Sequence, residues 1–172
     1  MSISERQLQL AKIAIEGFVL HGFHGLSIQM CGDEVNLAKG SLYHYIDSKL
    51  DLADMALDRA TQSISPMLDA FEESRDTDAL FEAVIGAHEN VSNLLLPAIL
   101  VEAGDAALTD KARECLKTLK LKLLDSALPI LKPFREDLNY FALLGLCLHQ
   151  RIFKAPDRDA LLAVREGLNE SN

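Results

Sequence analysis

The stretch that decides the fold is FVLHGFHGLSIQMCGDEVNLAKGSLYHYIDSKLDL, residues 18–52. Ser27 predicts the start of a short helix over residues 28–34, because a Ser side chain can accept hydrogen bonds from the free amides of a first helical turn. Asn36 suits a tight turn, since Asn tolerates the left-handed backbone conformation. A further helix is predicted over residues 38–45. Two short helices separated by so few residues have the layout of a helix-turn-helix.

Helices are also predicted on both sides of this stretch. Ser4 and Gln7 have the spacing of a capping box, and the helix that they begin should run to Leu20 and stop at Gly22. Gly17 inside that helix is expected to cost about 1 kcal/mol relative to Ala. The remaining predicted helices cover residues 48–71 with Pro66 as a possible break, 78–95, 97–104, 108–128, 135–154 and 157–168, with a polar loop at 72–78. The fold class is therefore all-α.

The strongest motif covers residues 39–45, Lys-Gly-Ser-Leu-Tyr-His-Tyr, and is followed by Ser48 and Lys49. The upstream positions that fit the same pattern are Phe18, Gly22, Phe23, Ser27 and Ile28. Together they resemble the DNA-binding domain of the TetR family of transcriptional regulators. The resemblance implies a helix-turn-helix domain over residues 1–47, followed by a helical effector-binding and dimerisation domain over residues 48–172. The C-terminal part varies in that family, so the resemblance says little about the effector.

DNA contacts are expected from the first residues of the recognition helix, which lie in the major groove. Gly40 allows close approach of the backbone, and Lys39 is able to reach a guanine edge or a phosphate. Lys49 adds its charge to the free amides at a helix start, a combination that binds anions. The predicted DNA-binding residues are Ser27, Gln29, Ala38, Lys39, Gly40, Ser41, Tyr43, His44, Tyr45 and Lys49.

Each of these residues also has an ordinary structural interpretation. Ser27 would cap a helix in any helical protein, Lys39 alone would be a solvated lysine, and one of Tyr43 and Tyr45 should pack inward. Only their combination at these spacings favours DNA binding.

Several residues depart from the family pattern. Ala38 stands where the family prefers Ser or Thr, Leu26 where Thr is common, and Ile46 where an aromatic residue is usual. Asp33 and Glu34 add negative charge near the expected DNA face. These departures predict modest affinity, stronger salt sensitivity or a narrow operator preference.

The charge balance is unusual for a DNA-binding chain. The net charge is −9, and residues 1–60 alone hold five basic and eight acidic side chains. DNA binding must then depend on a few placed groups rather than on bulk charge.

The longest apolar run, residues 94–101, is too short to cross a bilayer, and the N-terminus does not have the pattern of a signal peptide. We expect a cytoplasmic protein with no membrane contact.

No cofactor or metal is expected. Cys31, Cys115 and Cys147 are odd in number and far apart, so free thiols in a reducing compartment are favoured over a disulfide framework. His21 and His24 lie three residues apart at a helix end, with no sign of the four convergent ligands of a zinc site.

The effector region offers weaker signals. Many of its apolar side chains would fill an ordinary helical core equally well, and the polar groups embedded among them are the better candidates for orienting a ligand. The pattern favours a small, largely apolar effector. The predicted effector residues are Phe71, Phe81, His88, Asn93, Leu94, Ile99, Glu102, Leu116 and Leu119.

Dimerisation is predicted from the last two helices. The helix over residues 135–154 is apolar nearly all round, so it needs partners on both faces, and in so short a chain one partner should be a second copy. The predicted dimer interface contains Phe141, Gly145, Leu148, Ile152, Leu161, Val164 and Leu168.

Two function classes remain open on the sequence. The favoured hypothesis is a homodimeric, effector-responsive regulator, expected to be a repressor, which binds a palindromic operator in double-stranded DNA. The alternative is a helical ligand-binding or adaptor protein that has lost DNA binding, which the acidity of residues 1–60 and Ala38 favour. An enzyme is not expected, because the chain contains no nucleophile elbow, phosphate loop or paired carboxylate motif.

Overall fold

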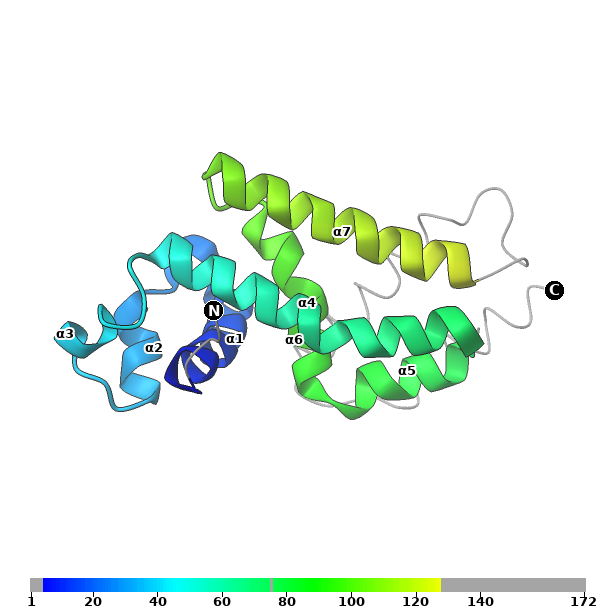
Figure 1. Ribbon diagram of the computed structural model, residues 1–172, viewed down its shortest axis with the longest axis horizontal. Helices are drawn as coiled ribbons and strands as arrows, with labels where there is room; N and C mark the ends of the chain where they lie inside the picture. The colour runs from blue at the N-terminus through cyan, green and yellow to red at the C-terminus, as the bar shows by residue number, and fades with distance from the viewer. Residues whose placement is uncertain (1–4, 75, 128–172) are drawn as a thin grey trace. The chain divides into compact units, whose positions relative to one another are not determined.

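All the regular secondary structure that the computed structural model describes is helical, and short connections join the helices. The structure describes residues 5–74 and 76–127, which contain seven α-helices and no strand (Figure 1). The helices are α1 (Glu5–Gly25), α2 (Ile28–Glu34), α3 (Lys39–Leu42), α4 (Lys49–Ser74), α5 (Thr77–Gly86), α6 (His88–Leu100) and α7 (Ala106–Ala127). The all-α prediction is confirmed.

The chain divides into two units, Met1–Leu128 and Pro129–Asn172, and every described residue lies in the first. The predicted helices over residues 135–154 and 157–168, with the predicted dimer residues Phe141, Gly145, Leu148, Ile152, Leu161, Val164 and Leu168, lie outside the described residues. The proposed domain boundary between residues 47 and 48 falls just before α4 and stays a prediction.

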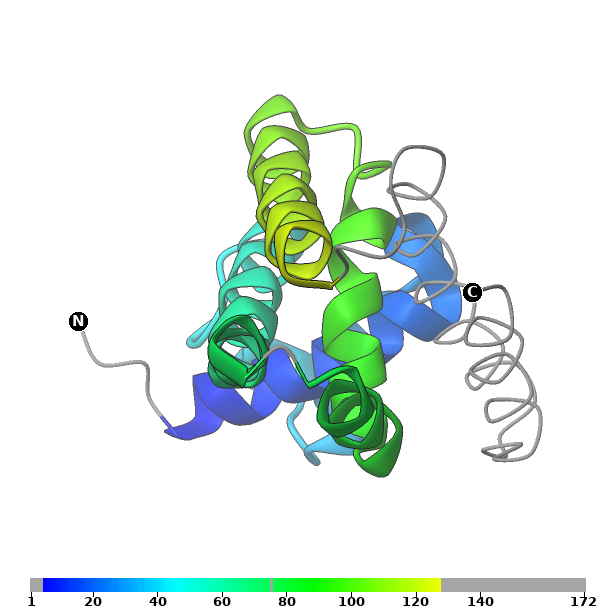
Figure 2. The same cartoon turned by 90° about the vertical axis from the view of Figure 1, so that its right-hand side faces the viewer.

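The core of the first unit forms where α1, α4 and α6 pack against one another. Figures 1 and 2 show α1 and α7 on opposite sides of α4 and α6. Phe18 of α1, Leu57 of α4 and Leu96 of α6 are fully buried there. Burial of such side chains removes apolar surface from water and is the main source of stability for the unit. The core therefore connects the first helices of the chain directly to the predicted effector region.

The two short helices form as the sequence predicts, with one change of length. The bounds of α2 are as expected, and Asn36 has the expected positive φ of 55°. The helix α3 ends at Leu42 instead of Tyr45, because the amides of His44 and Tyr45 bond to carbonyls three residues back and form turns. Such bonds are typical of a tightened helix end.

Helix ends depend on tertiary packing more than the sequence signals suggest. The helical backbone resumes after Gly22, whose φ of 71° breaks the regular geometry, and α1 ends only at Gly25. Pro66 does not break α4, which continues to Ser74, so the predicted loop at 72–78 is shorter. The boundary expected near Pro97 lies instead at Ala87, and Pro97 is inside α6. Both prolines are therefore tolerated inside packed helices, although each removes a backbone donor.

Candidate nucleic-acid interface

The position of α3 depends on its contact with α2. A β-carbon on Gly32 would lie 2.5 Å from Leu42 Cδ1 and 3.0 Å from Leu42 Cγ. Leu42 is fully buried, so a shift of its side chain would disturb the packing around it. Gly32 therefore permits the two helices to approach closely enough for the Leu42 side chain to anchor α3 to the core.

With Leu42 inside, the other side of α3 faces solvent. Lys39, Gly40 and His44 are exposed, and Tyr43 is 49% exposed although it is a large aromatic residue. The structure thus brings these four predicted residues onto one surface segment. A Cβ on Gly40 would meet no atom within 4 Å, which leaves the backbone open to an approaching partner.

Tyr45 lies on the inner side of the same segment. It is half-buried against the core, and its carbonyl oxygen accepts a hydrogen bond from Gln7 Nε2 at 2.9 Å. The capping partner predicted for Gln7, Ser4, lies outside the described residues. Sequence reasoning missed that Gln7 connects α1 to the turn after α3, because a contact across 38 residues leaves no local signal.

The starts of the short helices differ in their caps. Ser27 Oγ accepts from the Met30 amide at 3.2 Å and caps α2 as predicted. Ala38 stands at the start of α3 without a side-chain cap, also as expected. Before α4, Ser48 Oγ accepts from the Asp51 amide at 3.1 Å, and Asp51 Oδ2 accepts from the Asp47 amide at 2.9 Å. These bonds fix the start of α4, while the start of α3 keeps its amides free of side-chain caps.

Lys49, predicted to bind DNA phosphate, lies against the end of α1. Its Nζ donates to the His24 carbonyl oxygen at 3.4 Å and is 4.9 Å from the centroid of the Phe23 ring. Phe23 stacks in turn on the buried Phe18. Partial burial lowers the pKa of Lys49. The ammonium group therefore joins the start of α4 to the end of α1, a role that the sequence did not predict.

The departures from the family pattern have structural explanations. Leu26 and Ile46 are buried, and a β-carbon on Gly17 would lie 2.7 Å from Leu26 Cδ1. Leu26, which is larger than the Thr common at this position, thus fills the space that a side chain on residue 17 would need. Gln29 donates to Asp33 Oδ1 at 2.6 Å, so one predicted DNA contact and one of the acidic residues are joined in this structure.

The predicted effector residues do not all share one environment. Those with buried side chains are Phe71, Asn93, Leu94 and Leu119, whereas Ile99 and Leu116 are half-buried and Glu102 is exposed. The side chains of Phe81 and His88 lie outside what the structure describes. The Glu102 carbonyl oxygen lies 3.2 Å from His24 Nε2, so this end of α6 contacts α1.

Two neighbouring polar side chains in α6 are buried without partners. Asn93 is fully buried, and neither its Oδ1 nor its Nδ2 has a hydrogen-bond partner among the described residues. The same is true of the Ser92 hydroxyl. Pro97, four residues later, has no N–H to donate to the Asn93 carbonyl oxygen. Because unpaired buried polar groups are destabilising, this part of α6 is suited to receive a polar group from elsewhere.

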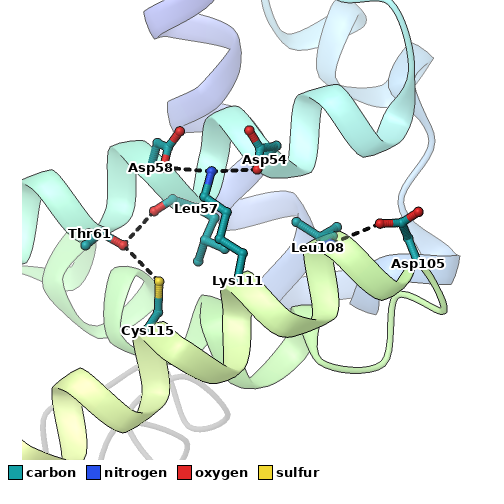
Figure 3. A network of polar contacts seen from close by, with 8 residues as sticks. All are labelled: Asp54, Leu57, Asp58, Thr61, Asp105, Leu108, Lys111 and Cys115. Carbon is teal, nitrogen blue, oxygen red and sulfur yellow. Dashed lines mark hydrogen bonds and ion pairs between the residues drawn. The ribbon is translucent and has the colours of Figure 1, made fainter.

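An ion-pair network joins α4 to α7 (Figure 3). Lys111 Nζ lies 2.6 Å from Asp54 Oδ1 and 2.9 Å from Asp58 Oδ1, and Thr61 Oγ1 lies 3.6 Å from Cys115 Sγ. Burial disfavours the charge on Lys111, but hydrogen bonds to the two carboxylates outweigh that effect and raise its pKa. The network fixes α4, the helix that begins beside α3, against α7 of the predicted effector region.

The described residues offer few further groups that could react, bind a metal ion or span a membrane. Cys31 is buried in the core, and burial raises the pKa of its thiol to about 11. Within residues 5–74 and 76–127, no three His, Cys, Asp or Glu side chains lie close enough together to hold a metal ion. In the same part of the chain, no helix is both long and apolar enough to span a bilayer.

Comparison with known proteins agrees with this arrangement. The described α1–α4 region overlaps residues 11–56, which match the family model of bacterial regulatory proteins, tetR family. A similar solved structure is a transcriptional regulator (TerR/AcrR family) from Aquifex aeolicus VF5, with a TM-score of 0.60 and 19% identity. That alignment covers 96% of this chain and 99% of the other, which shows a shared fold. No curated protein matches the chain. Residues 11–56, which contain the helix-turn-helix, therefore match the tetR family of bacterial regulatory proteins.

Proposed function

We propose that this protein binds a palindromic operator in double-stranded DNA as a homodimer in the cytoplasm, and acts as a repressor whose binding changes with a small effector. The observation that carries the proposal is the exposed side of α3. Lys39, Tyr43 and His44 lie open to solvent there, while Leu42 holds the helix to the core. Exposed cationic and hydroxyl groups on a short helix of this kind suit contacts with base edges and phosphates.

The test is direct binding to DNA. Sites are selected from random double-stranded DNA with the purified full chain, and affinity for the selected site is measured by fluorescence anisotropy. Lys39→Ala should weaken binding and relax the sequence preference, because Lys39 is exposed at the start of α3. Lys117→Ala is the control, since Lys117 is an exposed lysine on α7. A two-fold protein should select an inverted repeat, with half-sites about 34–36 Å apart or a multiple of that distance.

An effector site in the α6 region is part of the same proposal. Ser92 and Asn93 are buried polar groups without partners, and they are flanked by the buried Leu94, Leu95 and Leu96. A largely apolar molecule with a group that both donates and accepts hydrogen bonds would satisfy the Asn93 amide and bury its own apolar part. Because α6 packs on both α1 and α4, movement of α6 would reach the helix-turn-helix.

Dimerisation rests on the sequence pattern of residues 135–168. The interface proposed there contains Phe141, Gly145, Leu148, Ile152, Leu161, Val164 and Leu168. A helix that is apolar nearly all round needs cover on both faces, and a second copy supplies it.

The alternative, a protein that has lost DNA binding, has its own support. Lys49 is directed at the His24 carbonyl oxygen, and the net charge of residues 1–60 is negative. If no DNA sequence is enriched by the chain in the selection experiment, the adaptor hypothesis replaces the repressor.

A further inference from the structure

A groove of about 520 Å³ lies between α1 and α2, outside the predicted effector region. One end is closed by Glu89 of α6, which pairs with Lys12 of α1 at 3.5 Å. The volume is within the range of about 300–1,000 Å³ typical of small-molecule sites. None of the residues predicted to bind DNA or effector lines it.

The inner surface of the groove is apolar. Leu26 and Cys31 are buried and line it, and burial raises the pKa of the Cys31 thiol to about 11, so this side chain adds no charge to the surface. Two apolar side chains on its walls are open to water, since Leu20 is 60% exposed and Met30 is 38% exposed. Both would lose contact with water if an apolar molecule occupied the groove, which favours such a ligand.

The edge of the groove is acidic. The carboxylates of Glu16, Glu34 and Glu89 line it, together with Lys12, which pairs with Glu89, and His21. Glu16 has a partner of its own, and Glu34 is exposed to solvent. An anion entering the groove would meet like charge, whereas a cation would meet opposite charge while its apolar part contacts Leu20 and Met30.

We propose that the α1–α2 groove binds a small amphipathic organic cation, with its apolar body on Leu20 and Met30 and its charge beside Glu34. Charge complementarity selects this ligand class over an apolar anion or a neutral hydrocarbon. The site is distinct from the proposed effector site on α6 and from the exposed side of α3. Binding of the ligand does not require that the chain bind DNA, so the proposal holds or fails independently of the proposed function.

The test compares two probes of closely matched size and shape and opposite charge, tetraphenylphosphonium and tetraphenylborate. Binding of each to the full chain is measured by isothermal titration calorimetry in low salt. We expect tetraphenylphosphonium to bind saturably and to weaken as salt is raised, because the contacts with the carboxylates are exposed to solvent. Tetraphenylborate should bind about 2- to 5-fold more weakly, the scale of one exposed charge contact.

Two variants locate the cation. Glu34→Gln should weaken tetraphenylphosphonium about 2- to 5-fold, since it removes one solvent-exposed charge and keeps the shape. Leu20→Ala should weaken it about 3- to 10-fold by removing apolar contact area. Both positions are exposed, so the fold should survive, and thermal unfolding checks this.

The matched controls are Glu73→Gln and Leu121→Ala, which make the same chemical changes at exposed positions on α4 and α7. Neither control should alter binding. If both Glu34→Gln and Leu20→Ala bound tetraphenylphosphonium as tightly as the parent chain, the cation would lie elsewhere and the proposal would be overturned. Equal binding of the two probes would show an apolar site without charge selection, and no binding would show that another part of the chain or a second copy covers the groove. Either result also overturns it.

Discussion

Gly32 of α2 and Leu42 of α3 are packed so closely that any side chain on residue 32 would overlap with Leu42. The distance from a β-carbon at position 32 to Leu42 Cδ1 would be 2.5 Å, and Leu42 is fully buried. Leu42 of α3 thus inserts against the bare backbone of α2 at Gly32. The predictions below begin with this contact.

Gly32→Ala should destabilise the protein by about 1–3 kcal/mol, because Leu42 would have to leave its packed position. It should also abolish binding to the selected DNA site, since α3 moves with Leu42. Gly40→Ala is the control, because a β-carbon there meets no atom within 4 Å. Urea denaturation should show Gly40→Ala to be at least as stable as the parent chain, because Ala favours a helix over Gly. Equal stability of Gly32→Ala would contradict the packing argument.

Lys39→Ala should flatten the salt dependence of DNA binding. In a dimer, the loss of two phosphate contacts lowers the log–log slope by about 1.8, at about 0.9 per contact. If Lys39 contacts a base, the change in slope is smaller and the change in sequence preference is larger. Anisotropy titrations between low and moderate salt provide the measurement.

Lys49→Ala should reduce both affinity and stability, because Lys49 Nζ also donates to the His24 carbonyl oxygen. The loss of affinity should be even across DNA sequences, as expected for a phosphate contact. Lys49→Arg keeps the charge and a donor and should retain most of both properties. Unchanged DNA affinity in both Lys39→Ala and Lys49→Ala would favour the adaptor hypothesis.

Lys111→Met should lower stability by up to about 1 kcal/mol at neutral pH, the range for partly exposed ion pairs. The carboxylates of Asp54 and Asp58 raise the pKa of Lys111 above its ordinary value of 10.5. Since the folded pKa is the higher one, the stabilisation is present below pH 10.5 and is lost as pH rises through the folded pKa.

The difference in stability between Lys111→Met and the parent chain should therefore be constant near pH 7–9 and shrink above pH 10.5. Lys117→Met, at a solvent-exposed pair with Glu114, is the control and should change stability less. A constant difference up to pH 12 would show that Lys111 acts through packing rather than charge.

Asn93→Leu should stabilise the free protein by about 1 kcal/mol or more, because it replaces a buried amide without partners by an apolar side chain of similar shape. The same variant should lose the response to the effector. Thermal shift screening of lipophilic compounds, followed by operator titration with each hit, gives both results. A variant that is less stable than the parent chain would show that the Asn93 amide is satisfied in the intact protein.

Leu148→Glu should yield monomers or insoluble protein, because a charge in an apolar dimer interface is costly. Sedimentation or size-exclusion chromatography with light scattering measures the assembly. Leu121→Glu, at an exposed position of α7, is the control and should leave the assembly unchanged. A stable dimer carrying Leu148→Glu would remove residues 135–168 from the interface.

Much of the helix-turn-helix could be predicted from the sequence because its signals are local. Ser27 caps α2 through an amide three residues away, and Asn36 takes a positive φ within its own turn. Local chemistry of this kind is independent of the rest of the fold. Once Leu42 is predicted to be a core residue, helix geometry also predicts which side of α3 faces solvent.

The missed features all involve residues far apart in the chain. Gln7 bonds to Tyr45 across 38 residues, and Lys111 pairs with carboxylates more than 50 residues earlier. No short-range pattern marks such partners. The error at Pro97 has the same origin, because packing against other helices outweighs the local penalty of a proline inside a helix. The same packing explains why Pro66, a possible break on the sequence, lies inside a continuous α4.

The contact between Gly17 and Leu26 constrains the order in which this protein can change. A β-carbon at position 17 would lie 2.7 Å from Leu26 Cδ1 and 3.0 Å from its Cδ2, so the leucine side chain would have to shift to make room for it. Leu26→Thr removes both crowding methyl groups from that direction and opens space for Ala at position 17. A lineage can therefore pass through Leu26→Thr and then Gly17→Ala, which restores helix propensity in α1. The reverse order leads through an overpacked intermediate, so each residue depends on the history of the other.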